Sequence, residues 1–279
     1  MTTQSNPTTE STTTSGVPCG RFVWYDLITT NVPAATAFYT SVAGWGTQDF
    51  DMGPGGKYQM WTVAGVPVGG VVQLTPAMGA PGTPPRWMAH VSVPNVDESA
   101  AQVVSLGGKV LSPPSDIPTV GRYAVVADPQ GAAINLFTPL QGSAPQAFAP
   151  KVGEFSWHEL ATSDHRAAFS FYSKVLAWEN QGSNDMGPPM GEYLMFGQGG
   201  DPARPAPYGG MFTMSPDMRM PPGWVYYIRV ASADETVATI KSLGGQVLHG
   251  PVDVPGGDRI AQCMDPQGAM FAVHSVKDG

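Results

Sequence analysis

The sequence has few charged residues and few basic ones, and this shortage excludes several classes of protein. Only 13% of the 279 residues are charged, and 14 Lys and Arg stand against 22 Asp and Glu, a formal net charge of −8. Nucleic-acid binding depends on basic side chains that neutralise phosphates, so this balance argues against DNA or RNA as a partner. It also disfavours an anionic membrane surface, although one local Arg could still meet a small anionic ligand.

Long apolar runs and a secretory leader are also missing. No apolar stretch approaches the roughly 18 residues that a membrane-spanning helix needs. The first residues, MTTQSNPTTESTTTSG, have neither the basic start nor the apolar core of a signal peptide. Their Thr and Ser content predicts a disordered tail over residues 1–18. We therefore expect a cytoplasmic protein, monomeric or homodimeric, with no membrane partner.

What the chain does have is an internal repeat. The segments FVWYDL and FYTSVAGW of residues 22–45 return as FSWHEL and FYSKVLAW in residues 155–178. Further along, PPRW, SLGG and DPQGA return as PPGW, SLGG and DPQGA. Each copy has the length of a small domain, which indicates a tandem duplication. We predict domains at residues 19–139 and 153–277, with a linker at 140–152.

Cysteine is also scarce, with two residues in the chain. Cys19 and Cys263 lie in different copies and at positions that do not correspond. A structural disulfide would be expected to recur with the repeat, so both are interpreted as free thiols in a reducing compartment.

Within each copy the pattern predicts a strand, a helix and three strands, twice over. Residues 22–28 alternate large and polar side chains, as a half-buried strand does. Asn31 is placed to cap a helix, and the segment NVDESAAQVVSLGG predicts a second helix with an acidic first turn and a glycine stop. The second copy predicts helices at 164–178 and 234–243. The fold class is therefore α+β, with four βαβββ units in two domains.

A βαβββ pair with Phe-Tyr in its first helix and a DPxG turn before its last strand resembles the vicinal-oxygen-chelate superfamily. This superfamily includes glyoxalase I, bleomycin-resistance proteins and extradiol dioxygenases. The motif W-x-[DE]-L-x-T at Trp24 and Trp157, with PP-x-W and DPQGA, is similar to the two-domain glyoxalase-like branch. The resemblance covers residues 20–140 and 153–277. It implies paired units that curve into a U-shaped, barrel-like sheet around a hollow that binds a small molecule.

The superfamily usually holds a divalent metal with His or Gln on the first strand, His on the fifth and Glu on the eighth. The corresponding positions here are Trp24, Met88 and Asn135, then Trp157, Val225 and Ala272. Trp, Met and Val offer no oxygen or imidazole donor for such a cation. The sequence therefore predicts no cofactor at the usual positions. One alternative stays open, a displaced two-ligand metal site made by Glu159, His274 and waters.

Strand alternation places another set of residues on the same face as the lost metal positions. Two residues further along each strand lie Asp26, His90 and Phe137, and in the second domain Glu159, Tyr227 and His274. A carboxylate that faces an apolar hollow should have a raised pKa, which suits a general acid or base. Asp26 and Glu159 are thus the candidate catalytic residues. The candidate ligand-binding residues are Trp24, His90, Trp157, Tyr227, His274, Arg122 and Arg259.

The acidic and imidazole candidates also have structural interpretations. Asp26 and Glu159 could cap a helix or pair with an Arg. His90 and His274 have no counterpart in the other copy, so a histidine of the core or of the rim is the favoured interpretation of each. His158 is expected to face away from the hollow, on the outer face or between the domains.

Arg122 and Arg259 correspond to each other in the two copies. They could clamp an anionic ligand, but pairing with Asp128 and Asp265 is the favoured interpretation.

Three kinds of function remain open. The first is a glyoxalase-like lyase, isomerase or hydroxylase that acts on a small metabolite. The second is a protein that binds or sequesters an aromatic or aldehyde-bearing molecule without chemistry, as in resistance, and the third is a scaffold. The second copy carries an insertion between Gly197 and Gly210, so we expect at most one active hollow.

Overall fold

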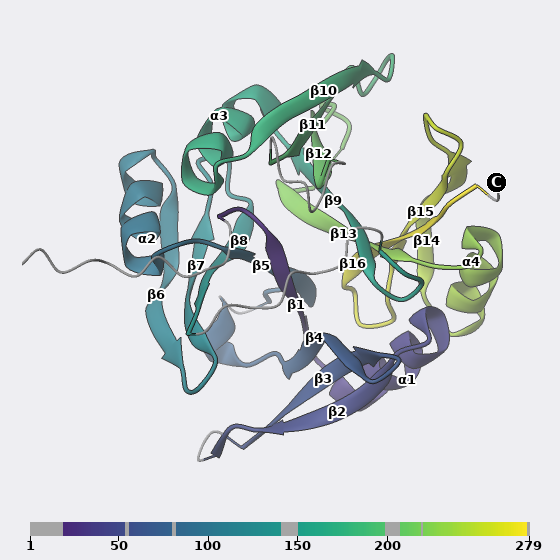
Figure 1. Ribbon diagram of the computed structural model, residues 1–279. Coiled ribbons are helices and arrows are strands. Elements are labelled where there is room, and N and C mark those ends of the chain that lie inside the picture. Colours follow the sequence, from purple (N-terminus) through teal and green to yellow (C-terminus); the bar gives the residue numbers. More distant parts are fainter. Residues whose placement is uncertain are drawn as a thin grey trace, which may run out of the picture.

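Two curved β-sheets form the frame of the molecule (Figure 1). The computed structural model describes residues 19–53, 56–79, 82–140, 150–198, 207–218 and 220–277. The predicted tail at 1–18, most of the predicted linker and much of the predicted insertion lie outside the described residues.

The N-terminal sheet contains eight strands in the described ranges, in the order β2-β3-β4-β1-β5-β8-β7-β6. Its strands are β1 (Phe22–Thr29), β2 (Gly46–Asp51), β3 (Lys57–Val63), β4 (Val66–Gln73), β5 (Arg86–Ser92), β6 (Lys109–Ile117), β7 (Gly121–Ala127) and β8 (Ala133–Pro139). The C-terminal sheet repeats this order as β10-β11-β12-β9-β13-β16-β15-β14. Its strands are β9 (Phe155–Thr162), β10 (Glu179–Asp185), β11 (Glu192–Gly197), β12 (Gly209–Thr213), β13 (Gly223–Arg229), β14 (Gln246–Asp253), β15 (Arg259–Met264) and β16 (Met270–Ser275).

One helix follows the first strand of each unit, as the sequence predicted. The helices are α1 (Val32–Ala43), α2 (Val96–Ser105), α3 (His165–Leu176) and α4 (Ala233–Ser242), and the short 3₁₀ helix η2 covers Pro76–Met78. Helix α1 begins where the side chain of Asn31 accepts a hydrogen bond from the backbone N–H of Ala34. It ends at Gly44, whose φ of 70° is left-handed. Within the described ranges, every helix is too short or too polar to traverse a lipid bilayer.

The topology confirms the predicted α+β fold of paired βαβββ units. Strand β1 pairs antiparallel with β5, so the two units of the N-terminal domain join along their first strands. Strands β2–β4 and β6–β8 then form the two arms of a U (Figure 1). The sheets are curved and open, and neither is closed into a barrel.

The two faces of each sheet have different roles. On β1, Tyr25 and Leu27 point into the main hydrophobic core, while Trp24 and Asp26 alternate onto the concave face. A register shift between Phe22 and Trp24 turns Phe22 into the core as well. The concave face of the C-terminal sheet has its own small cluster of buried residues: Val225, Tyr227 and Ala272.

A single hydrophobic core spans both domains. Tyr25 stacks on Phe155 with ring centroids 3.8 Å apart, and its hydroxyl lies 2.6 Å from Nε2 of His158. His158 is fully buried, and the ring of Phe22 stacks on it at 3.6 Å. The prediction that His158 faces away from the hollow is thus confirmed, and it lies between the domains. In the same interface, Tyr39 of α1 donates a hydrogen bond to Asp265 Oδ2 at 3.2 Å.

Candidate functional site

The polar side chains on the concave face of the N-terminal sheet gather around His90. Nε2 of His90 lies 2.8 Å from Oδ2 of Asp26, and Nδ2 of Asn135 lies 3.0 Å from the same nitrogen. Tyr58 donates a hydrogen bond to Oδ1 of Asp26, and Trp24 donates to the Tyr58 hydroxyl at 2.7 Å. The sequence placed Asp26, His90 and Trp24 on one face, and the structure brings them together.

Strand pairing explains why these residues meet. In the antiparallel pair of β1 and β5, Trp24 lies opposite His90 and Asp26 lies opposite Met88. In the parallel pair of β5 and β8, His90 lies beside Asn135. Cross-strand partners point to the same face of a sheet, so three strands deliver their polar side chains to one spot.

Burial makes this cluster chemically unusual. The side chains of His90 and Asp26 are 7% and 17% exposed. Asn135 is 6% exposed, and its Oδ1 has no hydrogen-bond partner. Native proteins seldom leave a buried polar atom unpaired, because the lost hydration is not recovered. Burial, then the nearby Asp26 carboxylate, raises the pKa of the Tyr58 hydroxyl, so Tyr58 acts as a neutral donor.

The C-terminal sheet carries a matching cluster around Glu159. Tyr193 donates to its Oε2 at 3.0 Å, while Tyr227 and Gln262 donate to its Oε1 at 3.0 and 2.7 Å. Trp157 donates to the Tyr193 hydroxyl at 2.8 Å, as Trp24 does to Tyr58. Burial raises the pKa of Glu159, and the three hydrogen bonds oppose that shift only in part.

The alternative left open for the C-terminal hollow paired Glu159 with His274, and in the structure these two side chains have other partners. Nδ1 of His274 lies 2.9 Å from the Ser156 hydroxyl, and Nε2 lies 2.9 Å from Oδ2 of Asp258. Glu159 is bonded instead to the two tyrosines and to Gln262. Glu159 and His274 are thus held by separate sets of partners, and no hydrogen bond joins them among the described residues.

The pairing expected for the two arginines was also wrong. Arg122 donates to Asp97 at 2.7 Å and to Asp116 at 2.7 Å, rather than to Asp128. Asp116 is its cross-strand neighbour in the pair of β6 and β7.

Arg259 makes the same arrangement with Asp234 and Asp253, rather than with Asp265. Asp265 instead accepts from backbone N–H groups of its own turn and from Tyr39. Contact of either arginine with a ligand stays a prediction.

Sequence reasoning missed Tyr58 and Tyr193, although the repeated Gly-Gly pairs at 69–70 and 209–210 were a signal for them. A Cβ added to Gly70 would lie 1.8 Å from the Tyr58 hydroxyl oxygen, and one added to Gly210 would lie 2.0 Å from the Tyr193 ring. Each tyrosine therefore crosses the neighbouring strand over a glycine to reach its carboxylate. Gly69-Gly70 and Tyr58 of the first copy recur as Gly209-Gly210 and Tyr193 of the second. The recurrence indicates that both halves use the same arrangement.

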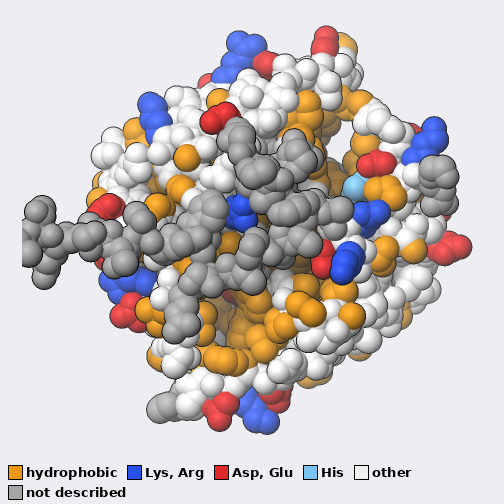
Figure 2. Space-filling view, viewed as in Figure 1, with side chains coloured by type: hydrophobic (Ala, Val, Ile, Leu, Met, Phe, Trp, Pro, Cys, Tyr) orange, Lys and Arg blue, Asp and Glu red, His pale blue; other side chains and the backbone are white. Residues whose placement is uncertain are grey.

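Apolar side chains surround the polar clusters. Figure 2 shows hydrophobic side chains gathered in the hollow between the arms β2–β4 and β6–β8, and again between β10–β12 and β14–β15. Around His90 the rings of Phe137 and Tyr123 lie at 5.9 and 6.2 Å. A small molecule with an apolar body and a polar end fits these surroundings.

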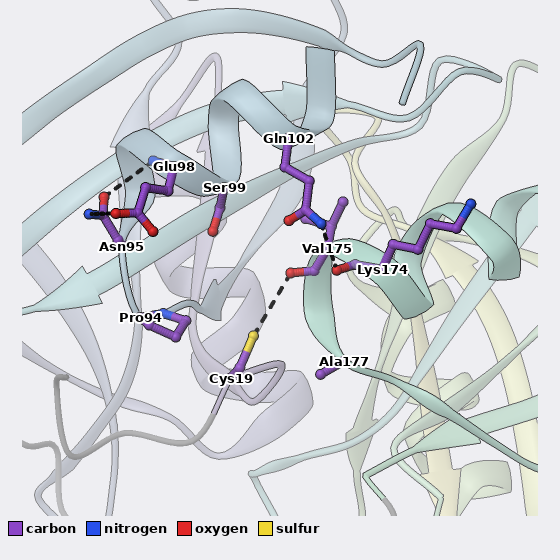
Figure 3. A pocket seen from close by; sticks show the side chains of 9 residues that line it. All are labelled: Cys19, Pro94, Asn95, Glu98, Ser99, Gln102, Lys174, Val175 and Ala177. Carbon is purple, nitrogen blue, oxygen red and sulfur yellow. Dashed lines mark hydrogen bonds between the residues drawn. The ribbon is translucent and has the colours of Figure 1, made fainter. Parts of the chain in front are cut away.

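A separate groove of about 260 Å³ lies between α2 and α3, on the other side of the sheets (Figure 3). Cys19 lines it, with its thiol 3.8 Å from the Val175 carbonyl oxygen. Burial raises the pKa of Cys19 to about 11, so the thiol is protonated and unreactive at neutral pH. Gln102 donates to the Lys174 carbonyl at 3.1 Å and ties the two domains together across this groove.

Comparison with known proteins identifies the family. The model of the Glyoxalase/Bleomycin resistance protein/Dioxygenase superfamily matches residues 21–136 and 154–273. The chain belongs to this superfamily. It is 37% identical over 253 residues to the candidate glyoxylase CFP32 of Mycobacterium tuberculosis (strain CDC 1551 / Oshkosh), covering 90% of this chain and 92% of the relative. It is 30% identical over 275 residues to the anthracycline biosynthesis protein DnrV of Streptomyces peucetius, covering 93% of this chain and 94% of DnrV.

Solved structures share the fold of this superfamily member at low identity. The Mn(II)-bound glyoxalase from Novosphingobium aromaticivorans matches with a TM-score of 0.59 and 17% identity, over 93% of this chain and 82% of the other. The 2,2',3-trihydroxybiphenyl 1,2-dioxygenase from Sphingomonas wittichii strain RW1 matches with a TM-score of 0.60 and 14% identity, over 92% and 90%. Both likenesses concern the fold.

The prediction that no cofactor is involved is corrected by these comparisons. A solved structure with this fold carries Mn(II), so a metal belongs to the chemistry that the fold supports. At the usual first-domain positions, Trp24 and Met88 provide no suitable donor and Asn135 provides one. Among the described residues, no group of three or more His, Cys, Asp or Glu side chains could hold a cation. The residues at the usual positions therefore do not fit a divalent cation.

Proposed function

We propose that this protein binds a small organic molecule in the hollow of its N-terminal domain, residues 19–139, and acts on it as a glyoxalase-like enzyme. Asp26 is the proposed proton acceptor, and His90 holds it in position. The single observation that carries this proposal is the 2.8 Å contact between Asp26 and His90 on the concave face. Histidine and the acidic side chains are among the groups that serve in general acid–base catalysis, and here one of each lies within hydrogen-bond reach of the other.

The surroundings of Asp26 support this role. Tyr58 donates to one carboxylate oxygen, so the carboxylate is fixed in orientation while its other oxygen faces His90. Hydrogen-bond donors and acceptors that rigid strands already hold in place need no free energy to reorganise when the ligand reacts. The aromatic and apolar walls of the hollow suit a ligand whose polar group lies next to an apolar body.

The C-terminal domain, residues 153–277, is proposed to be the less reactive partner. Glu159 is enclosed by three donors, from Tyr193, Tyr227 and Gln262. A proton transferred to Glu159 from a ligand would have to displace one of these bonds. We therefore assign the acid–base role to Asp26 rather than to Glu159.

A second candidate function is non-catalytic binding or sequestration, as in resistance to a toxic compound. The enclosed Glu159 favours it for the C-terminal hollow, because a carboxylate that is fully hydrogen-bonded suits recognition better than proton transfer. The relatives include a candidate glyoxylase and an anthracycline biosynthesis protein by name.

The test is a ligand screen followed by a matched pair of variants. Thermal-shift and calorimetric titrations would use the adduct of methylglyoxal with a thiol, an anthracycline and simple aromatic metabolites. For any ligand that is turned over, we expect Asp26→Asn to lower kcat by about 10²–10⁴, the usual contribution of acid–base catalysis. Glu159→Gln should leave kcat within a few-fold.

Three outcomes are distinct. Loss of turnover in Asp26→Asn alone supports the proposal. Binding without turnover in the wild type favours sequestration. An equal loss in Glu159→Gln, or no ligand at all from the screen, contradicts the assignment of the N-terminal hollow.

A further inference from the structure

We propose that Asp26, His90 and Asn135 form a divalent-cation site in the N-terminal hollow, displaced from the positions that the superfamily uses. Each donor comes from a different strand, β1, β5 and β8. Two of them lie two residues beyond the usual positions on their strands, while Asn135 lies at one. The site offers one imidazole nitrogen, one carboxylate oxygen and one amide oxygen.

The distances between the donors fit a shared cation. With bonds of about 2.1 Å, neighbouring ligands of an octahedral ion lie about 3 Å apart. Oδ2 of Asp26 lies 2.8 Å from His90 Nε2, and the Asn135 amide lies 3.0 Å from the same nitrogen. A half-turn of that amide about its last side-chain bond exchanges Nδ2 for Oδ1, which has similar size and the required lone pairs. Binding also requires His90 to carry its proton on Nδ1.

The orientation of the Asn135 amide supports this half-turn, because Nδ2 and not Oδ1 faces His90 in the structure. Oδ1 of Asn135 is buried and has no hydrogen-bond partner. Buried polar atoms are seldom left unpaired. The half-turn would bring this oxygen to the present place of Nδ2 beside His90, where a bound cation would satisfy it.

The residues behind the donors are arranged as the outer ligands of metal sites are. Tyr58 donates to Oδ1 of Asp26 and leaves Oδ2 for the cation, and Trp24 donates in turn to Tyr58. Such outer hydrogen bonds orient a ligating carboxylate, and their loss typically lowers metal affinity about 10–100-fold. Gly70 provides the space in which Tyr58 reaches Asp26.

The second half of the chain serves as an internal control. It keeps the carboxylate, tyrosine and tryptophan, as Glu159, Tyr193 and Trp157. The places of His90 and Asn135 are taken by Tyr227 and Ala272, so two of the three donors are replaced. The N-terminal hollow alone should therefore bind the cation.

The donor types indicate which cation binds. One imidazole with two oxygens suits Mn²⁺, Fe²⁺ or Zn²⁺ better than Ca²⁺, which takes six to eight oxygens. A bound divalent ion would supply positive charge that polarises a ligand oxygen.

This inference rests on the same hollow as the proposed function but not on the identity of the organic ligand. Asp26 can accept a proton only while it is free of the cation. The two roles therefore exclude each other at any one moment, and they are measured separately: organic-ligand binding in the presence of a chelator, and cation binding without the organic ligand.

The test uses the full chain, stripped with EDTA and desalted. Mn²⁺ is titrated, and the free ion is counted from its six-line electron paramagnetic resonance signal. We expect about one bound equivalent per chain, at least a tenfold loss of affinity in Asp26→Asn and in His90→Gln, and about a tenfold loss in Tyr58→Phe. Glu159→Gln should bind like the wild type. Circular dichroism and thermal unfolding confirm that each variant is folded.

Absence of bound Mn²⁺ in the wild type overturns the inference, as does binding that survives both Asp26→Asn and His90→Gln. Equal loss in Glu159→Gln moves the site to the other domain and overturns it too. Asn135→Ala provides a further readout should a ligand variant fail to fold. Ligand binding in chelator without any Mn²⁺ binding would leave the proposed function standing and remove the metal site.

Discussion

Gly70→Ala tests the arrangement on which both proposals depend. The new Cβ would lie 1.8 Å from the Tyr58 hydroxyl oxygen and 2.2 Å from the ring carbon that bears it. Tyr58 would have to leave its place and give up its hydrogen bonds with Asp26 and Trp24. A bond to a charged group is worth about 1.5–3 kcal/mol and a neutral one about 0.5–1.5 kcal/mol. Allowing for partial relaxation, the unfolding free energy should fall by about 2–4 kcal/mol.

The assay is urea unfolding followed by tryptophan fluorescence. Gly223→Ala is the matched control, because its added Cβ meets nothing closer than the Pro221 carbonyl oxygen at 3.9 Å. That change should cost less than about 0.5 kcal/mol. In a Tyr58→Ala background the overlap is gone, so Gly70→Ala should cost less than about 1 kcal/mol there.

The double-mutant comparison decides the matter. If Gly70→Ala destabilised the protein equally with and without the Tyr58 ring, the cost would come from the backbone and not from the tyrosine. A single-variant cost below about 0.5 kcal/mol would likewise refute the argument.

Two further predictions concern the C-terminal carboxylate and the domain interface. Burial raises the folded-state pKa of Glu159. The stability that the protonated Glu159 contributes is therefore complete below about pH 4.3, its usual unfolded pKa, and is lost as pH rises through the folded pKa. Glu159→Gln should flatten that loss in unfolding free energies measured from pH 4 to 8, and a profile parallel to that of the wild type would contradict the argument. Tyr39→Phe removes the hydroxyl that donates to Asp265 and should lower the unfolding free energy measured in urea by about 1–2 kcal/mol. We expect the whole unfolding curve to shift. A separate early transition of one domain would show that the two halves do not unfold as one.

Most of the fold was predicted from the internal repeat and from the two-residue alternation of side chains along each strand. They gave the order of elements, the helix caps and the faces of β1 and β5. They also brought Asp26 and His90 to one face, because a strand period of two fixes the side of a residue once its strand is known. The tyrosines were missed, because Tyr58 reaches Asp26 across β4 over a glycine, and no pattern within a single strand reports that crossing.

The failures have a shared physical cause. His274 was placed on the right face of β16, but Asp258, just before β15, bonds it instead of Glu159. Arg122 was matched to the nearest repeated acid, Asp128, although its partner across the strands is Asp116. Partners of polar side chains depend on register and on loops, and neither is encoded in the alternation of a single segment.

A comparison of the two halves of the chain distinguishes the residues that position the carboxylate from those that determine its chemistry. Both keep a tryptophan, a tyrosine seated over a glycine and a carboxylate, so this set positions the carboxylate whatever the hollow does. They differ where the sheet adds its remaining polar groups: His90 against Tyr227 and Asn135 against Ala272. In the C-terminal half the carboxylate is satisfied by donors of the protein itself. In the N-terminal half a ring nitrogen faces the carboxylate, and the neighbouring Asn135 amide keeps an unpaired oxygen, so the N-terminal hollow still has a bond to offer to something from outside the chain.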